Sequence, residues 1–413
     1  MLDQAERELV RAVESRLDEE IAFLREVVDL DSGTLNLAGV REVGGRFARE
    51  LGLLGFSTRW ADLPSSMGRA GHLVAERPAP ERRGMRVLLL GHLDTVFEGA
   101  GHRFARTGEQ ARGAGITDMK GGDVAIVFAL QALHSAGALE RAAVRVILTG
   151  DEENPALPGE VSRGELIRAA AESDVVLSFE TDSGRIAIGR RGLTKWSLEV
   201  SGAQGHSASI LRPALGAGAV YETARALDGF RQAFSGHPTV TVNPGIALGG
   251  TRVEYDPAAG SGSAAGKFNI VAPRACVRGD LRFVSDTERE EAKERMRAIA
   301  ADSLPRTGSR LEFENLAPGW PATEGNRRLL AVVDAVSRDL GQGPAAADDP
   351  ASRGFGDMNF IGAAIPGIDG LGVSGVGEHS PSETMDLGSL APSTARAAVL
   401  IGRLLRMEEL PGL

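Results

Sequence analysis

The chain has 413 residues, of which 42% are hydrophobic, and its formal net charge at pH 7 is −10. This charge argues against nucleic acid or an anionic membrane as the main partner, and no apolar run approaches the roughly 18 residues of a membrane helix. Because single cores rarely grow beyond about 250–300 residues, at least two domains are expected.

The N-terminal region is charged and lacks a continuous apolar stretch, which argues against a signal peptide. Apolar residues at helical spacing predict one amphipathic helix there, built on Leu9, Val10, Val13, Leu17, Ile21, Leu24 and Val27. The single cysteine, Cys276, excludes an internal disulfide and a cysteine-based metal cluster, and we interpret it as a small core residue. We therefore expect a cytoplasmic protein.

Three short apolar runs, at 87–90, 144–148 and 175–179, have the length and composition of strands buried on both faces. Helices are predicted at 43–54 before the first run and at about 124–133 between the first two. Strands that alternate with helices favour an α/β fold with a doubly wound, mostly parallel sheet.

The pattern changes near residue 193, where Thr194, Trp196, Leu198 and Val200 alternate as in a strand covered on one side. A helix at about 214–227, a half-exposed strand at 275–283 and a helix from a Ser285–Glu288 capping box to about 303 follow. We interpret residues 193–309 as a smaller α+β domain with an antiparallel sheet, inserted into an α/β domain of residues 1–192 and 310–413.

Three further segments complete the predicted elements. Residues 256–266 are rich in Gly, Ser and Ala, which predicts a mobile surface loop. Residues 329–340 are expected to be helical. The apolar runs 363–365 and 371–373 are candidates for further strands of the α/β sheet.

Acidic and histidine residues follow the predicted strands. They are His92 and Asp94 after the first, Glu152 and Glu153 after the second and Glu180 at the end of the third, with Asp118 before a glycine pair and His379 in a Gly-rich turn. Ligands gather at the carboxyl ends of strands in open α/β sheets, so we expect these side chains to converge. Imidazole and carboxylate groups suit Zn²⁺, and one carboxylate can bridge two ions.

Each of these residues also has a simpler interpretation. The acidic pair could lie in a solvated loop, Asp118 could cap a helix, and His379 could be an ordinary turn residue. Glu180 could likewise be an ordinary loop residue. Asp94, two residues from His92 in an extended chain, would support a metal site by accepting the second ring N–H of His92 and fixing its tautomer. The set as a whole favours a metal site over these separate explanations.

Seven segments, in chain order, resemble the dinuclear zinc exopeptidase and aminoacylase family (metallopeptidase family twenty): GHLDTVFE, GITDMKGGD, LTGDEEN, LSFETDSG, SGAQGHSA, FNIVAP and GEHSPSE. Its members include glutamate carboxypeptidase, succinyl-diaminopimelate desuccinylase, acetylornithine deacetylase and aminoacylase, and the resemblance is nearest to the glutamate carboxypeptidase branch. It spans nearly the whole chain. The resemblance implies a zinc-dependent exopeptidase-like α/β domain with an inserted ferredoxin-like α+β domain that acts as a lid and dimerises.

The resemblance also implies two divalent metal ions, most simply Zn²⁺, with Co²⁺ or Mn²⁺ as alternatives. His92, Asp118 and Glu180 would hold one ion. Asp118, Glu153 and His379 would hold the other, so that Asp118 bridges the two.

Catalytic roles follow from the same motifs. Glu152 would be the general base for a metal-bridging water, and Asp94 would be the partner of His92. His206, in SGAQGHSA, resembles the histidine that reaches the partner subunit's active site and stabilises the oxyanion; its alternative is a surface histidine.

Three residues resemble the substrate-binding groups of the family. They are Asn269 in FNIVAP, Arg282 in GDLRF and Gly356 in GFGD. An exposed ion pair with Asp280 is the alternative for Arg282. Many relatives have Gly-Gly-Thr/Ser-Asp where this chain has GFGD, so the side-chain pocket and the substrate stay open.

The implied function is hydrolysis of the amide bond in an N-acyl amino acid or a dipeptide-like substrate with a free carboxylate, by a homodimer joined through the inserted domain. Alternatives within the family are a carbamoyl-amide (ureide) hydrolase and a strict dipeptidase. A single-domain zinc aminopeptidase is disfavoured by the inserted domain and the His206 motif. A non-catalytic binding protein with a relict site is disfavoured by the complete metal set.

Overall fold

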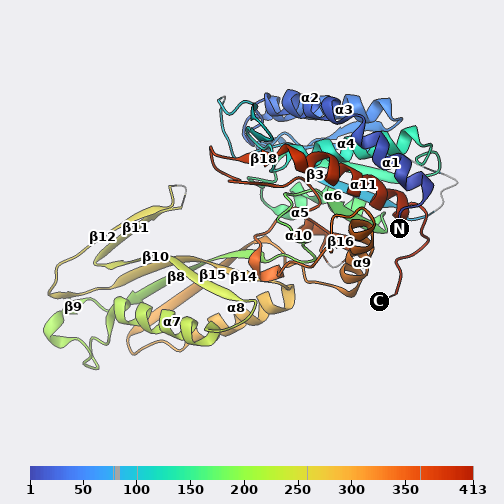
Figure 1. The fold of residues 1–413 in the computed structure, drawn as a ribbon. Coiled ribbons are helices and arrows are strands. Elements are labelled where there is room, and N and C mark those ends of the chain that lie inside the picture. Colours follow the sequence, from blue (N-terminus) through green and yellow to red (C-terminus); the bar gives the residue numbers. More distant parts are fainter. Residues whose placement is uncertain (78, 80–83, 100, 258, 363, 413) are drawn as a thin grey trace. The chain divides into compact units, whose positions relative to one another are not determined.

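The computed structural model describes residues 1–77, 79, 84–99, 101–257, 259–362 and 364–412 (Figure 1). The chain folds into two compact units. The first unit comprises Met1–Gly189, Pro321–Pro350 and Gly356–Leu413, and the second comprises Arg190–Trp320 with Ala351–Phe355. Each unit has its own buried apolar cluster, and the core of the first unit draws on both ends of the chain.

A six-stranded mixed sheet forms the centre of the first unit. In spatial order its strands are β1 (Ser57–Ala61), β2 (His72–Arg77), β6 (Val144–Thr149), β3 (Val87–His92), β7 (Val175–Ser178) and β16 (Gly367–Ile368). β3 pairs in parallel with β6 and β7, and β7 pairs in parallel with β16. β2 is antiparallel to both of its neighbours. The α/β prediction is confirmed: the sheet is mixed, and three of its five strand pairings are parallel.

Sequence composition accounts for the central strands. Val87, Leu88, Leu89 and Leu90 are each at most 1% exposed, as expected for a strand covered on both faces. β3 extends two residues beyond the predicted apolar run of 87–90, so His92 is itself the last residue of the strand. The strand thereby delivers its imidazole directly at the carboxyl edge of the sheet.

Helices pack around this sheet: α1 (Gln4–Glu14), α2 (Leu17–Val28), α3 (Leu37–Leu53), α4 (Lys120–Ser135), α5 (Gly159–Ser162), α6 (Gly164–Ala171), α9 (Glu324–Asp339), α10 (Met358–Ile361) and α11 (Leu390–Leu404). The prediction of a single N-terminal helix is wrong, because α1 ends at Glu14 and α2 begins at Leu17. Val13 of α1 and Leu24 of α2 are buried in the same cluster. Each of the two helices buries its own apolar face in that core. Because the apolar spacing continues from α1 into α2, the sequence pattern does not show where the helix breaks.

A small sheet with the order β17-β18-β5-β4 joins distant segments of the first unit. Its strands are β4 (Ala105–Thr107), β5 (Gln110–Arg112), β17 (Gly375–Val376) and β18 (Thr384–Asp386). β5 pairs antiparallel with β18, with Ala111 opposite Met385. Asp118 follows β5 in the sequence and His379 lies between β17 and β18, so this pairing brings their segments together.

The predictions of strands at 363–365 and 371–373 are wrong: residues 364–365 and 371–373 form no strand, and residue 363 lies outside the described residues. Residues 364–365 form a turn, and the strand in this region is β16 at Gly367–Ile368. Leu371 and Val373 are buried but form no strand. Gly370, with φ 85°, bends the backbone out of the extended conformation between β16 and these residues.

The second unit is built on an antiparallel sheet with the order β10 (Thr241–Gly250), β14 (Arg274–Phe283), β8 (Gly192–Gly202) and β15 (Thr307–Ala317). α7 (Gly218–Phe234) and α8 (Asp286–Ala301) contact this sheet, and Trp196 and Leu198 are buried in the cluster between them. The predicted capping box of Ser285 and Glu288 is confirmed at the start of α8. Shorter pieces complete the unit: β9 (Gly205–His206), β13 (Ile270–Val271) and a 3₁₀ turn η2 (Ser207–Ser209).

The Gly-, Ser- and Ala-rich segment 256–266 is not simply a loop, which corrects the prediction. β11 (Arg252–Asp256) and β12 (Ser261–Ala265) form a β-hairpin in which Tyr255 lies opposite Gly262. The ladder uses backbone groups alone, so small side chains do not prevent it. The turn between the strands includes Gly260, whose φ of 59° suits glycine; residue 258 lies outside the described residues.

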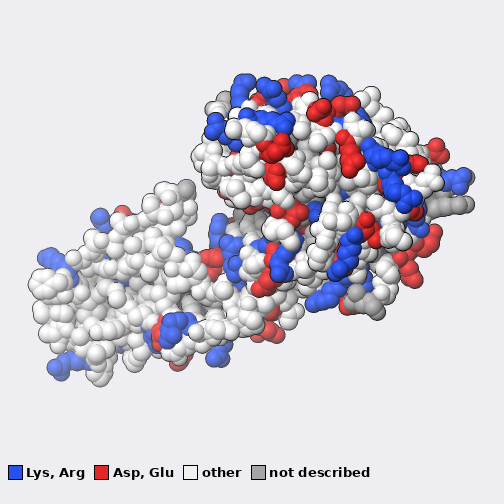
Figure 2. All heavy atoms as spheres, in the orientation of Figure 1, with Lys and Arg blue, Asp and Glu red and all other residues white. Residues whose placement is uncertain are grey.

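Charged side chains of both signs are interspersed on the first unit in the face seen in Figure 2. Among the helices of the described residues, none combines the length and apolar character needed to cross a bilayer. Three further 3₁₀ turns, η1 (Ser65–Met67), η3 (Pro350–Ser352) and η4 (Leu387–Ser389), lie in connections between the longer elements.

Candidate metal centre

His92 stands at the end of β3 with both ring nitrogens engaged. Its Nε2 lies 3.0 Å from Oδ1 of Asp118 and 3.7 Å from Oε1 of Glu180. Its Nδ1 lies 3.0 Å from the backbone oxygen of Asp94 and 3.6 Å from Oδ1 of the same residue. The structure thus places Asp94 beside His92, with the carbonyl of Asp94 nearer than its carboxylate.

The Asp94 carboxylate holds the acidic turn after β6 in place. It accepts hydrogen bonds from the amide N–H groups of Glu152 at 3.0 Å and Glu153 at 3.1 Å, and from the Thr34 hydroxyl at 2.7 Å. Burial raises the pKa of Asp94 to about 6, against the opposing effects of His92 and Thr34. One side chain therefore sets the position of both His92 and the glutamate pair.

Asp118 lies between the two histidines. Its Oδ1 faces Nε2 of His92 and its Oδ2 faces Nε2 of His379, each at 3.0 Å. Burial alone would raise the pKa of Asp118, but its hydrogen bonds to His379 and His92 outweigh burial and lower it. A carboxylate whose two oxygens point at different imidazoles has the arrangement that a bridging ligand requires.

His379 and Glu153 complete this side of the cluster, with Nε2 of His379 3.1 Å from Oε2 of Glu153. The hydrogen bonds of His379 to Asp118 and Glu153 raise its pKa to about 11. His379 has a φ of 59°, a conformation that non-glycine residues adopt rarely and at a cost. The strained turn between β17 and β18 thus directs the imidazole into the cluster.

Glu152 and Glu180 lie on the other side of His92. Ligand atoms of His92, Glu152 and Glu180 lie within 4.8 Å of one another, and so do those of His92, Asp118 and Glu153. Desolvation raises the pKa of Glu152 and of Glu180 well above the ordinary value for glutamate. Enclosed carboxylates of this kind are stabilised by a cation, and the nitrogen and oxygen donors are those that Zn²⁺ and related ions accept.

Sequence reasoning missed Glu383, which shapes the loop before α4. Its carboxylate accepts hydrogen bonds from the amides of Gly115 at 2.9 Å, Thr117 at 2.8 Å and Asp118 at 3.2 Å, and from the Thr117 hydroxyl at 2.9 Å. The only signal was its place at the end of the GEHSPSE motif. Glu383 thereby couples the backbone of Asp118 to the segment that carries His379.

The predicted substrate residue Gly356 is buried in the first unit with its backbone groups engaged. Its N–H donates to Oδ1 of Asn359 at 2.9 Å, and its carbonyl accepts from the Asn359 amide at 3.0 Å. Gly356 is therefore placed as a structural turn residue, and its neighbour Asp357 carries the charged group of this loop.

The other three predicted residues lie in the second unit. His206 of β9 pairs with Ile270 of β13, and the Asn269 carbonyl accepts a hydrogen bond from the Ser207 amide, so His206 and Asn269 are close. Arg282 of β14 lies elsewhere and contacts Asp280, with Nε 2.9 Å from Oδ2. The ion pair considered in the sequence analysis is thus present.

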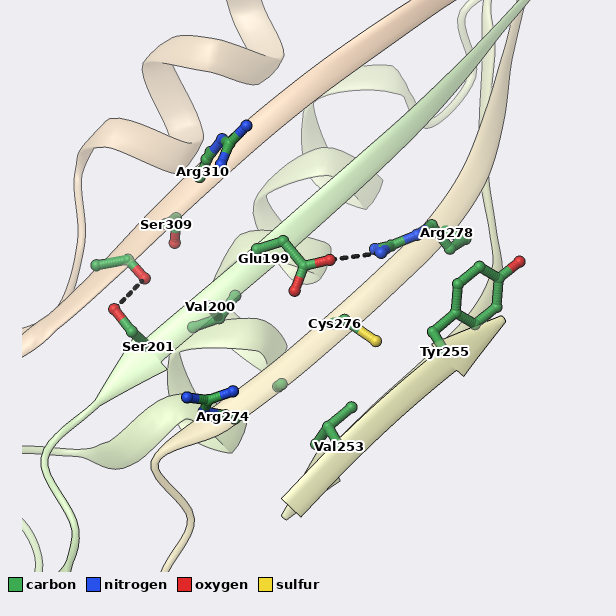
Figure 3. Close-up of a pocket in the computed structure, with 12 residues that line it drawn as sticks. Glu199, Val200, Ser201, Val253, Tyr255, Arg274, Cys276, Arg278, Ser309 and Arg310 are labelled. Carbon is green, nitrogen blue, oxygen red and sulfur yellow. Dashed lines mark hydrogen bonds and ion pairs between the residues drawn. The ribbon is translucent and has the colours of Figure 1, made fainter. Parts of the chain in front are cut away.

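A groove of about 660 Å³ opens in the second unit between the β11–β12 hairpin and the sheet (Figure 3). The Arg278 guanidinium lies 2.5 Å from the Glu199 carboxylate and 4.8 Å from the Tyr255 ring centre. Arg274 and Arg310 also line the groove. None of the predicted site residues lines it, so it is separate from the groups assigned by motif.

Comparisons with known proteins agree with these motifs. The family model described as Peptidase family M20/M25/M40 matches residues 88–403. The chain is similar to carboxypeptidase G2 of Pseudomonas sp. (strain RS-16), with 25% identity over 393 residues that cover 92% of this chain and 88% of that protein. It is also similar to succinyl-diaminopimelate desuccinylase of Bordetella petrii, with 28% identity over 331 residues that cover 75% of this chain and 80% of that protein.

Solved structures share the fold. Aminopeptidase PepT from Bacillus cereus superposes with a TM-score of 0.75 and 18% identity, over 94% of this chain and 98% of that one. The YXEP protein of Bacillus subtilis, described as a dinuclear metal binding peptidase from the M20 family, superposes with a TM-score of 0.65 and 16% identity, over 95% of this chain and 99% of that one.

Proposed function

The chain belongs to peptidase family M20/M25/M40, and from this premise we propose that it hydrolyses the amide bond of an N-acyl amino acid or a dipeptide-like substrate with a free carboxylate. The protein is a metallohydrolase by family. The two relatives are named as a carboxypeptidase and a desuccinylase, which supports an amide substrate of this class. The observation that carries the proposal is the position of Asp118 between His92 and His379, beside the Glu152–Glu153 turn.

The family binds two metal ions, and we propose that in this chain they are Zn²⁺, with Co²⁺ or Mn²⁺ as alternatives. His92, Asp118 and Glu180 would hold one ion, and Asp118, Glu153 and His379 the other. The contacts of 3.0–3.7 Å among these groups support the assignment. Two such cations polarise a carbonyl and make water a better nucleophile at neutral pH.

Glu152 is the proposed general base. It takes a proton from the attacking water and then delivers that proton to the leaving nitrogen, acting first as a general base and then as a general acid. Asp94 holds the Glu152 amide and orients His92, so it acts as a positioning group.

Substrate recognition is proposed to involve the second unit. Arg282 would anchor the substrate carboxylate by paired charged hydrogen bonds, exchanging its contact with Asp280 for the ligand. Asn269 and His206 would bind near the scissile bond, and the Gly356 loop would border the side-chain pocket. We further propose that the enzyme works in the cytoplasm as a homodimer.

The spacing of these residues within one chain supports a dimer. In the β8–β14 ladder Leu193 lies opposite Arg282, whereas Ser201 lies opposite Arg274 and precedes His206 by a few residues. The eight residue-to-residue steps from Leu193 to Ser201 span about 27 Å of strand. Within one chain, Arg282 therefore lies near one end of the β8–β14 ladder and the segment leading to His206 leaves from the other end, and a second copy could supply His206 to a site that uses Arg282.

Replacing Glu152 by Gln tests the proposal. We expect Glu152→Gln to bind as much metal as the wild type and to lose about 10²–10⁴-fold in kcat, because the base is removed and the ligands remain. Metal content is measured by elemental analysis, and amine release is measured on N-acyl amino acids, dipeptides and N-carbamoyl amino acids. Glu160→Gln, at an exposed glutamate nearby, is the matched control and should behave as the wild type.

Chelation separates the metal from the base. Treatment with a chelator should abolish wild-type turnover, and addition of Zn²⁺, Co²⁺ or Mn²⁺ should restore it to a degree that identifies the preferred ion. Full activity in the Glu152→Gln variant would refute the assigned base. Turnover that survives complete metal removal would refute the metallohydrolase mechanism in this chain.

A further inference from the structure

A fully buried arginine, Arg163, lies directly behind the turn that carries Glu152. Its side chain is 0% exposed and stands between two carboxylates, with Nη1 2.6 Å from Oδ1 of Asp151 and Nε 2.5 Å from Oδ1 of Asp357. It also donates from Nη2 to the Asp151 backbone oxygen at 3.1 Å. Arg163 therefore binds both the side chain and the main chain of Asp151, the residue before Glu152.

Further hydrogen bonds hold the end of β6 and the turn that follows it. The Thr149 hydroxyl donates to Oδ2 of Asp357 at 2.5 Å, and the Ala156 amide donates to Oδ2 of Asp151 at 3.0 Å. The Gly150 amide donates to Nδ1 of His72, another fully buried side chain, at 3.3 Å. Residues on both sides of Asp151 are thus tied down by contacts separate from the Asp94 hydrogen bonds.

Stability alone is a poor reason for such a group. Removing a guanidinium and two carboxylates from water is costly, and buried ion pairs often do no better than well-packed apolar residues of similar volume. A buried, planar guanidinium does fix the orientation of the groups that it contacts, because its N–H donors have a rigid planar arrangement. The contacts of Arg163 fix the acidic turn relative to Asp357, next to Gly356 in the loop assigned to the substrate pocket.

We propose that Arg163 is a positioning residue that fixes the Glu152 carboxylate for proton transfer and couples it to the 356–357 loop through Asp357. This inference rests on the proposed role of Glu152 as base. A displacement of the base by about 1 Å can cost about 100-fold in rate, so loss of the Arg163 contacts should lower kcat. Metal binding should change less than kcat, because only Glu153 among the five proposed ligands lies in the turn that Arg163 holds, and Asp94 and His379 also contact Glu153.

Three variants test the proposal. Arg163→Lys keeps the charge without the planar arrangement of donors, and Arg163→Met removes the charge at similar length. Thr149→Val removes only the hydroxyl that holds Asp357 and should fold even where the arginine variants do not. The matched control is Arg145→Met near the start of β6, where the arginine contacts Glu76 and Glu172 at 2.8 Å each but lies away from the acidic turn.

We expect the folded Arg163 variants to retain most of the wild-type metal content at saturating metal and a KM within about threefold, while kcat falls about 10- to 100-fold. Thr149→Val should show the same pattern at about 5- to 10-fold, and Arg145→Met should lose stability without loss of kcat. Hydrogen exchange at the Glu152 and Glu153 amides, measured on metal-free protein, should speed up in the Arg163 and Thr149 variants alone. This measurement reports the position of the turn without any assay of turnover.

Unchanged kcat and unchanged amide exchange in folded Thr149→Val and Arg163→Lys would overturn the proposal. If neither arginine variant folds, Thr149→Val decides the matter by the same two measurements. Failure of the proposed function is distinct, since it would appear as an active Glu152→Gln enzyme. An inactive Glu152→Gln enzyme together with unaffected Thr149→Val would reject only the role of Arg163.

Discussion

At the scale of single residues, the candidate centre depends on carboxylates with different tasks set by their surroundings. Asp118 faces two imidazoles, and these contacts lower its pKa, whereas desolvation raises the pKa of Glu152. Asp94 accepts hydrogen bonds from two amides and a hydroxyl, so it serves as a support. The chemistry assigned to each acid follows from its contacts, because the residue type alone does not distinguish them.

A buried glutamate outside the candidate centre, Glu20, should contribute to the pH dependence of stability. Glu20 of α2 is 0% exposed, and its Oε1 accepts a hydrogen bond from the Thr394 hydroxyl of α11 at 2.5 Å. Its Oε2 has no hydrogen-bond partner within the described part of the chain. Burial raises the pKa of Glu20 from 4.5 to about 8. Between these values the folded protein holds a proton that the unfolded chain releases, so stability falls as pH rises from about 4.5 to about 8.

Glu20→Gln should remove this penalty, since the amide keeps an acceptor for Thr394 and carries no charge. We expect the variant to match the wild type near pH 5 and to exceed it above pH 8 by up to about 4 kcal/mol in free energy of unfolding. Urea unfolding at pH 5, 7 and 9 measures the difference. A variant that is less stable than the wild type at pH 9 would contradict the buried, protonated state of Glu20.

At the scale of elements, the site could be predicted where chemistry follows an apolar run. Each of His92, Glu152 and Glu180 comes at or just after a strand that is visible in the sequence as a short, mainly aliphatic run. The parallel pairing of β3 with β6 and β7 then places those ends at one edge. The meeting of these side chains could therefore be predicted from the local sequence, once the parallel pairing of the strands had been inferred.

Elements and residues that depend on long-range contacts could not be predicted in this way. Arg163 and Glu383 are ordinary charged residues in the sequence, and only folding buries Arg163 against Asp357 and Glu383 under the loop of Asp118. The break between α1 and α2 lies within an unbroken apolar repeat, and β12 consists of small residues without alternation. In each case tertiary packing decides between structures that the local sequence permits equally.

The packing of α4 on β3 gives an element-scale prediction. A Cβ added at Gly91 of β3 would lie 1.9 Å from Oδ1 of Asp123 in the first turn of α4, so Gly91→Ala should force the two elements apart. We expect a loss of about 1–3 kcal/mol in stability. Both carboxylate oxygens of Asp123 are buried without a hydrogen-bond partner in the part of the chain that the structure describes.

Asp123→Ala should therefore relieve most of the cost of Gly91→Ala, because it removes the atom that the new Cβ would meet. A double-mutant cycle by urea unfolding measures this coupling. Additive losses in the double variant would show that the strain lies elsewhere. Gly45→Ala in α3, where an added Cβ meets nothing within 4 Å, is the control and should not destabilise the protein.

At the scale of the whole molecule, charge is divided unequally along the chain. The stretch from Arg190 to Trp320 contains 17 Lys or Arg and 14 Asp or Glu residues, a net charge of +3, although the whole chain has −10. The remainder therefore carries the negative charge, including the acids of the candidate centre. This division of charge is consistent with the proposal that the metal ions bind to the first unit and that Arg282 of the second unit anchors the substrate carboxylate.

The proposed use of a second copy leads to a prediction for the assembled enzyme. His206→Ala and Glu152→Gln should each be inactive, because one lacks the oxyanion contact and the other the base. If His206 acts in the partner's site, a mixed dimer has one complete site, made of Glu152 from the first variant and His206 from the second. Random exchange of equal amounts should then give about one quarter of wild-type activity per chain.

The measurement is amine release after the two variants are mixed under conditions that allow subunit exchange, with exchange verified by mass spectrometry of differently tagged chains. The control mixes the Glu152→Gln variant with the Glu153→Gln variant, because both residues belong to the metal centre of their own chain. Their mixed dimer carries one defect in each chain's own centre, so no site is complete and no activity should return. Verified exchange without recovery for His206→Ala would show that His206 serves its own chain or takes no part in the reaction.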